Sequence, residues 1–144
     1  MRAAARLLGS RGEHDEGLEA AGRAWGLAGL AQAFPVHGAQ GFIVAPQPPS
    51  SGDLGALIAA RDASAVRALT APLRERARSE LATARRGLAS APAAIWPAYG
   101  YAALVEPLLN ALDRPSADPF AIAGRKPGLG ARARLVLAAA RGRI

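Results

Sequence analysis

Apolar residues recur every three or four positions along most of the chain, and they never alternate with polar residues over the length of a strand. This spacing is typical of amphipathic helices, because about 3.6 residues make one helical turn. It predicts helices over residues 15–34, 64–89, 94–112 and 129–141. A shorter helix is predicted to begin in SSGDLGALIA, with Ser51 or Asp53 as its cap. The pattern therefore predicts an all-α protein.

Prolines and capping residues set the expected boundaries of these helices. The first is predicted to start at Asp15 as its cap and to stop before Pro35, whose nitrogen has no hydrogen to donate. Residues 35–54 are then expected to form an irregular connection. In the third long helix, Pro97 suits the first turn, whereas Pro107 is expected to bend the helix.

Composition adds detail to this picture without changing it. The chain has 144 residues, and 51% of them are hydrophobic, many of these alanine, while aromatic residues make up only 5%. Alanine-rich cores favour helices that approach one another closely. The MRAAARLLGSRG start could form a short helix or the end of a longer one, and DRPSADPF reads as a turn. We see no repeat and no boundary, and expect a single helical domain over residues 1–144.

Two absences exclude whole classes of chemistry and of location. The chain has no cysteine, which excludes disulfides, zinc sites with cysteine ligands and cysteine nucleophiles. No stretch is long and apolar enough to span a bilayer, and the apolar part of the N-terminus is too short for a signal peptide. We expect a cytoplasmic protein, with association at a membrane surface as an alternative.

The charge is strongly positive, at +7, and all but one of the 18 basic residues are arginine. Arginines can hold phosphate groups or an anionic membrane surface. They are dispersed along the sequence, and no aromatic residues alternate with them as in a nucleic-acid platform. We therefore do not expect nucleic acid as a partner, although a basic helical binder of nucleic acid or membrane remains an alternative that clustered arginines would favour.

Candidate catalytic residues are scarce. His14 stands among acidic residues just before the first helix, and His37 has no carboxylate or second histidine near it in the sequence. The eleven carboxylates never recur on an apolar helix at a spacing that gathers magnesium, and no phosphate loop, GxSxG or HExxH motif is present. The sequence thus predicts no catalytic residue and no metal site.

Several segments nevertheless follow one another in a recognisable order. They are GRAWGLAGLAQAFPVHGAQGFIVAP, RALTAPLRERARSELATARRGL, IWPAYGYAALVEPLLNAL, and ADPF followed by RARLVLAAARGRI. Together they resemble the C-terminal half of the squalene/phytoene synthase family. The resemblance covers nearly the whole chain and about the second half of a typical member. It implies the isoprenoid synthase fold, here as a partial helical bundle of about four to six helices.

In that family, two aspartate-rich motifs hold magnesium, which binds a prenyl diphosphate and neutralises the departing pyrophosphate. The second motif reads roughly R-D-x-x-E-D, and a short spacer and G-R-x-Y-x-P follow it. Here Gly41 and Pro46 match, whereas Phe42 and Val44 replace the arginine and the tyrosine. The positions of the arginine, the first aspartate, the glutamate and the last aspartate fall on Gln32, Ala33, Val36 and His37. Every carboxylate of the motif is absent, and the first motif would lie upstream of this chain.

These replacements resemble a divergent branch of the family that includes mitochondrial respiratory complex I assembly factors. The resemblance implies a catalytically inactive synthase-like protein that acts as a binding or assembly module, for a prenyl or lipid-like ligand or a respiratory-complex partner. Remnants of the prenyl cavity could be lined by Gly22, Trp25, Gly26 and Gly29, although such small residues also permit tight helix packing.

The alternative is a prenyl diphosphate transferase fragment that needs an upstream half. No cofactor is expected, and magnesium would be required only if this alternative holds. Half of a bundle would expose apolar faces, so we also expect a homo-oligomer or a protein partner.

Overall fold

The structure is a computed structural model that describes residues 1–42, 51–125 and 128–144. Within these residues the chain contains helices and no strand, which confirms the all-α fold predicted from the sequence. The α-helices are α1 (Arg2–Leu7), α2 (Asp15–Ala39), α3 (Ser51–Ala59), α4 (Ala63–Gly87), α5 (Val105–Asp113), α6 (Pro119–Ala123) and α7 (Leu129–Arg141). Two 3₁₀ segments, η1 (Ala93–Ala98) and η2 (Gly100–Leu104), precede α5.

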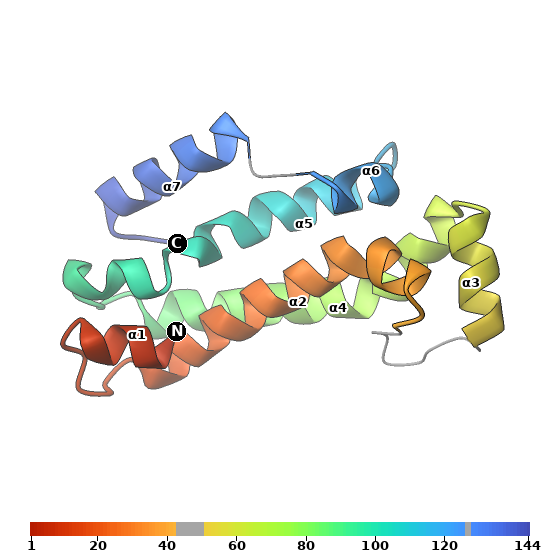
Figure 1. The fold of residues 1–144 in the computed structure, drawn as a ribbon. Coiled ribbons are helices and arrows are strands. Elements are labelled where there is room, and N and C mark those ends of the chain that lie inside the picture. The colour runs from red at the N-terminus through yellow and green to blue at the C-terminus, as the bar shows by residue number, and fades with distance from the viewer. Residues whose placement is uncertain (43–50, 126–127) are drawn as a thin grey trace.

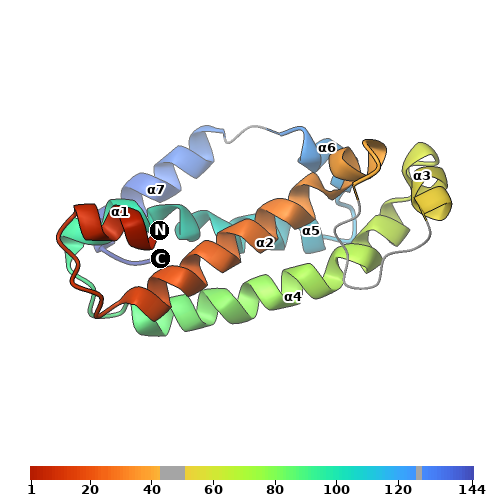
Figure 2. The same ribbon diagram turned by 60° about the horizontal axis from the view of Figure 1, so that its bottom comes forward.

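The two longest helices, α2 and α4, lie side by side and antiparallel along the whole molecule (Figure 1). Helix α5 packs against both of them, and α7 lies beyond it over η2 (Figures 1 and 2). Helix α3 stands at the far end of the α2–α4 pair, close to the place where α6 meets α2. The bundle therefore has α2 and α4 on one side and α7 on the other, with η2 and α5 between them.

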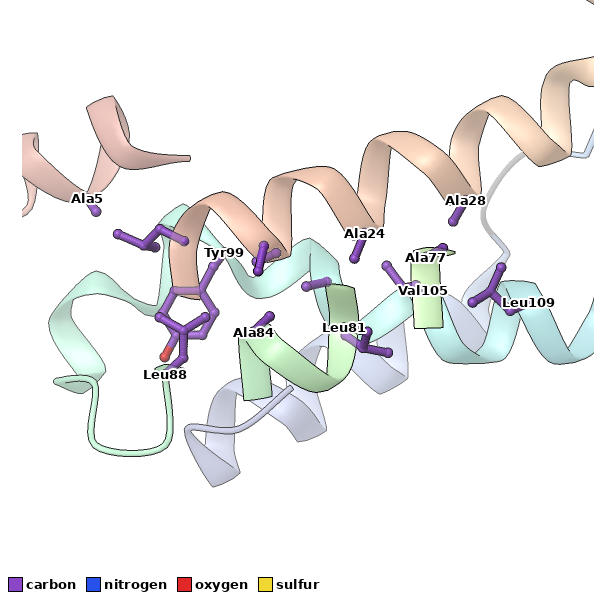
Figure 3. Packing of buried hydrophobic residues seen from close by; sticks show 14 of the residues in the cluster. Ala5, Ala24, Ala28, Ala77, Leu81, Ala84, Leu88, Tyr99, Val105 and Leu109 are labelled. Atoms are coloured by element: carbon purple, nitrogen blue, oxygen red, sulfur yellow. The ribbon is translucent and has the colours of Figure 1, made fainter. Parts of the chain in front are cut away.

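Small residues form the contact between α2 and α4. Figure 3 shows Ala24 and Ala28 of α2 near Ala77 and Ala84 of α4, and all four side chains are fully buried. The contact is closest where the pair begins, because a Cβ atom added to Gly17 would lie 2.9 Å from the backbone carbon of Gly87. A side chain at either of these two positions would force the backbones of α2 and α4 apart.

The first long helix does not stop before Pro35, as the sequence predicted, but continues to Ala39. Phe34 is 1% exposed and packs with Leu54 and Val66, so the turn that contains Pro35 is held against α3 and α4. A proline costs a helix one hydrogen bond, and burial of its neighbours compensates for that loss. Most of the predicted irregular connection, residues 43–50, lies outside the described residues.

The predicted helix over residues 94–112 is instead two 3₁₀ segments followed by α5. The tighter path brings the ring of Trp96 over Gly100, where an added Cβ would overlap the ring. Pro107 falls in the first turn of α5, where a backbone N–H has no partner within the helix, and therefore bends nothing.

The capping predictions are partly wrong. The cap residue of α2 is His14, without a side-chain hydrogen bond, and Asp15 accepts a bond from Arg6 at 2.8 Å instead. The side chain of Ser51, the other predicted cap, lies outside the described residues. Asp118 accepts from the backbone N–H of Phe120 at 2.8 Å, and the predicted turn thus contains the start of α6.

Buried charges connect the helices. Arg74 of α4 is 8% exposed and donates to Asp113 of α5 at 2.7 Å, while Arg78 donates to the other oxygen of the same carboxylate. Glu80 is 5% exposed and accepts from Arg23 of α2 at 2.9 Å. These pairs fix α4 against its two neighbours.

The pKa values of both carboxyls lie below their usual values. Burial alone would raise the pKa of the Glu80 carboxyl, but the hydrogen bonds and charges of Arg23 and Arg76 outweigh it and hold this pKa below its usual value. The same balance, with Arg78 and Arg74 as the cations, lowers the pKa of Asp113.

Candidate functional site

A groove of about 370 Å³ lies between α2 and α7, with α5 as its floor. Most of its lining is apolar and comes from η2, α5, α6 and the start of α7. The described lining residues are Trp25, Gln32, Leu104, Pro107, Leu108, Ala111, Ile122, Arg125, Gly128, Ala131 and Arg134. A groove of this size and polarity suits a ligand with an elongated hydrocarbon part.

Gln32 fixes one end of the groove. Its side-chain amide donates to the backbone carbonyl of Ile122 at 3.1 Å and thereby ties α6 to α2. The residue occupies the position where the family resemblance places the arginine of the second motif. In this chain that position holds the wall of the groove together, and both residues of the hydrogen bond line the groove.

Trp25 forms the other end of the α2 wall. It is 36% exposed, and its ring lies 5.7 Å from the ring of Tyr101 in η2, at an angle of 40°. The pair packs α2 against η2 at this end of the groove and leaves aromatic surface open to solvent. Of the four residues predicted as cavity lining, Trp25 is the one that the structure brings to the groove.

The three glycines predicted with it lie along α2 at positions where an added Cβ atom would meet no other helix. A Cβ added to Gly26 or Gly29 would meet nothing within 4 Å, and one added to Gly22 would only reach the side chain of Met1 at 3.9 Å. These glycines therefore do not serve the tight helix packing considered from the sequence. Gly29 stands four residues after Trp25 and three before Gln32, on the face of α2 that carries these two groove residues.

The remaining positions of the degenerate motif lie at the end of α2. Ala33 and His37 are half-buried, and Val36 is 44% exposed. The backbone carbonyl of His37 accepts from Phe42 at 2.9 Å, which closes the helix end. None of the three belongs to the described lining of the groove. Val44, which replaces the tyrosine of the motif, and the matching Pro46 lie outside the described residues.

Acidic and histidine side chains do not gather anywhere in the described part of the chain in groups of three or more that could hold a metal ion. His14, the other histidine considered from the sequence, lies with its ring Nδ1 3.3 Å from the backbone carbonyl of Gly87. That contact joins the start of α2 to the end of α4, so His14 helps to hold these two helices together.

Sequence reasoning missed the two arginines of the groove. Arg125 follows α6, and Arg134 lies in the middle of α7, so each reaches the groove from the C-terminal side. Neither forms an ion pair with another residue that the structure describes. Only the folding of α7 back over α5 shows that they share a wall, and no local pattern in the sequence signals it.

The fold and the site define a helical protein with an apolar groove between antiparallel helices and a basic wall on one side. The family model for squalene/phytoene synthase matches residues 1–139, and the chain belongs to this family. The match confirms the resemblance drawn from the order of the segments and agrees with an isoprenoid-synthase-like fold. Comparisons with curated proteins and with solved structures found no match.

Proposed function

We propose that this chain binds a prenyl diphosphate, or a lipid-like molecule with an anionic head, and does not ionise it. The observation that carries the proposal is the composition of the groove, in which apolar side chains of η2 and α5 lie opposite Arg125 and Arg134. The hydrocarbon part of such a ligand would contact the apolar wall. Guanidinium groups bind phosphate oxygens with two parallel hydrogen bonds, so the arginines suit the head.

The absence of catalysis is inferred from α2. In the family, the carboxylates of the second motif hold the magnesium that stabilises the departing pyrophosphate. The corresponding side chains here are an amide, a methyl group, an isopropyl group and an imidazole, at Gln32, Ala33, Val36 and His37. A hard cation prefers oxygen ligands with negative charge, which these side chains do not supply. On this proposal the chain is a binding module derived from the C-terminal half of a synthase.

Binding and turnover are tested together with geranylgeranyl diphosphate. We expect isothermal titration to show binding without magnesium, and Arg134→Gln to weaken it by roughly tenfold, since a charge-assisted hydrogen bond contributes about 1.5–3 kcal/mol. Arg132→Gln is the matched control, because Arg132 lies on the same helix outside the described lining of the groove. Equal effects of the two changes would contradict the assignment of the groove.

The transferase alternative is tested by the same protein with magnesium. The inactive reading predicts no pyrophosphate release above background from geranylgeranyl or farnesyl diphosphate. Magnesium-dependent release by the chain, alone or mixed with a separately encoded upstream half, would overturn the inactive reading even if the groove binds the ligand.

A second candidate is an assembly module that binds a protein, such as a subunit of a respiratory complex. The observation that favours it is the apolar surface at the end of α2, where Val36 is 44% and Phe42 65% exposed. Both residues stand at charged positions of the family motif. If this surface binds a protein or a second copy of the chain, Val36→Asp should abolish the partner seen by capture or by sedimentation, and Arg134→Gln should not.

A further inference from the structure

Helix α7 covers one side of the groove but buries none of its own residues. Leu129 is 82% exposed, Val136 71% and Leu137 49%, which places three large apolar side chains of one helix in solvent. The side of α7 that meets the groove carries Ala131 and Arg134 instead. The exposed apolar residues therefore belong to the side that faces away from the bundle.

Helical spacing joins these residues into one stripe. We call the set Leu129, Ala133, Val136, Leu137 and Ala140 the outer stripe; its members are three or four residues apart, and all are exposed. Arg132 adjoins the stripe on one edge, three residues after Leu129 and four before Val136. Arg141 adjoins it on the other edge, four residues after Leu137. Basic groups thus border the apolar stripe on both sides.

The surrounding charge is of one sign. Six basic residues and no acidic residue follow Asp118 in the sequence. Most arginines of α1 to α4 are paired with carboxylates, including Arg23, Arg74 and Arg78. No arginine after Asp118 forms an ion pair with a residue that the structure describes. The arginines are dispersed in the sequence, but in the fold most of those in α1 to α4 are neutralised by carboxylates. The arginines after Asp118 are not, and they make the C-terminal part of the surface basic.

We propose that the outer stripe of α7 binds the surface of an anionic lipid bilayer. A helix with a narrow apolar face between basic residues inserts that face at the level of the headgroups, while its cations contact the lipid phosphates. A second copy of the chain fits less well, because Arg132 and Arg141, which border the stripe, would meet the same basic residues of the other copy across the contact. Nucleic acid would bind the arginines but leave the apolar stripe in water.

The geometry also relates the two surfaces of α7. Its inner residues Ala131 and Arg134 line the groove, and its outer stripe would lie in the headgroup layer. A bound bilayer would therefore hold the groove next to the membrane surface, where hydrophobic ligands are concentrated. The bilayer contact does not depend on the ligand proposed for the groove.

The test is sedimentation of the full chain with vesicles of phosphatidylcholine, with or without phosphatidylglycerol. We expect binding only to the vesicles that contain phosphatidylglycerol, and weaker binding at high salt. Val136→Glu should weaken the binding on the order of tenfold, since it removes apolar area and adds a negative charge at the lipid phosphates. Leu7→Glu is the matched control, because Leu7 is 90% exposed on α1 and the change alters the net charge equally.

Four results would overturn the proposal. One is equal binding to both kinds of vesicle, and another is an equal loss of vesicle binding in Leu7→Glu and Val136→Glu. A third is a dimer that Val136→Glu dissociates, in a protein that binds no vesicle, which would assign the stripe to a second copy. The fourth is binding of duplex DNA by a chain that does not bind vesicles. Geranylgeranyl diphosphate binding by Val136→Glu should match the wild type, so a failure of the groove assignment is distinguished from a failure here.

Discussion

The contact between Gly17 and Gly87 makes a sharp prediction about the stability of the α2–α4 pair. In Gly17→Ala, the new methyl group would lie 2.9 Å from the backbone carbon of Gly87 and 2.9 Å from Cγ of Leu88. The backbone of α4 cannot rotate away as a side chain could, so the helices must separate locally. The same substitution at Gly26, also in α2, would place the methyl group in open space.

The two substitutions should therefore change the free energy of unfolding in opposite directions. Alanine is favoured over glycine in a helix by about 1 kcal/mol, and Gly26→Ala should gain roughly 0.5–1 kcal/mol. Gly17→Ala gains less from helix propensity, because Gly17 lies in the first turn of α2. Overpacking against α4 costs this variant about 1–3 kcal/mol. We expect it to lose roughly 1–2 kcal/mol overall. The free energy of unfolding of the two variants should thus differ by about 2 kcal/mol.

Urea denaturation measures this difference in the free energy of unfolding. The transition is followed by circular dichroism at about 220 nm, because helices give nearly all the signal of this fold at that wavelength. The slope of the transition should stay unchanged in both variants. If Gly17→Ala were as stable as Gly26→Ala, the close approach of α2 and α4 at this point would be wrong.

Two further predictions concern the buried charges. The pKa of Glu80 is lowered in the fold, so its ion pairs stabilise the protein above the unfolded pKa of about 4.3, and this stability is lost as the pH falls through that value toward the folded pKa. Unfolding free energies measured against pH should decline less steeply in Glu80→Gln; identical slopes would refute the linkage. Asp113→Asn leaves the guanidinium of Arg74 without its charged partner and should cost about 1–2 kcal/mol in urea denaturation, whereas an unchanged midpoint would show that the pair contributes nothing.

The long helices could be predicted from the sequence because their apolar residues repeat with the helical period over many turns. The errors lie where tertiary packing decides. Pro35 is a strong local signal for a helix end, but burial of Phe34 against α3 and α4 carries the helix past it. The 3₁₀ path around Gly100 depends on the ring of Trp96, which the periodicity does not reveal.

The candidate site was predictable only in part. The order of segments led to the family. Trp25 was expected at a cavity, and the structure places it in the lining of the groove, while its role there stays a prediction. Arg125 and Arg134 were not expected there, because their proximity to α2 depends on the return of α7 over η2 and α5. The role of Gln32 as a donor to Ile122 depends equally on a contact across 90 residues of sequence.

The two ends of the α2–α4 pair differ in the length of chain that must close to form them. Phe34 of α2 and Val66 of α4 are 32 residues apart, whereas Gly17 and Gly87 are 70 apart. Closing the longer loop costs about 0.7 kcal/mol more in chain entropy, so the Phe34 end should form first and the glycine end last. Substitutions at Phe34 should then slow folding, and those at Gly17 should mainly speed unfolding. The tightest contact of the bundle would thus govern how long the native protein lasts, and not how fast it forms.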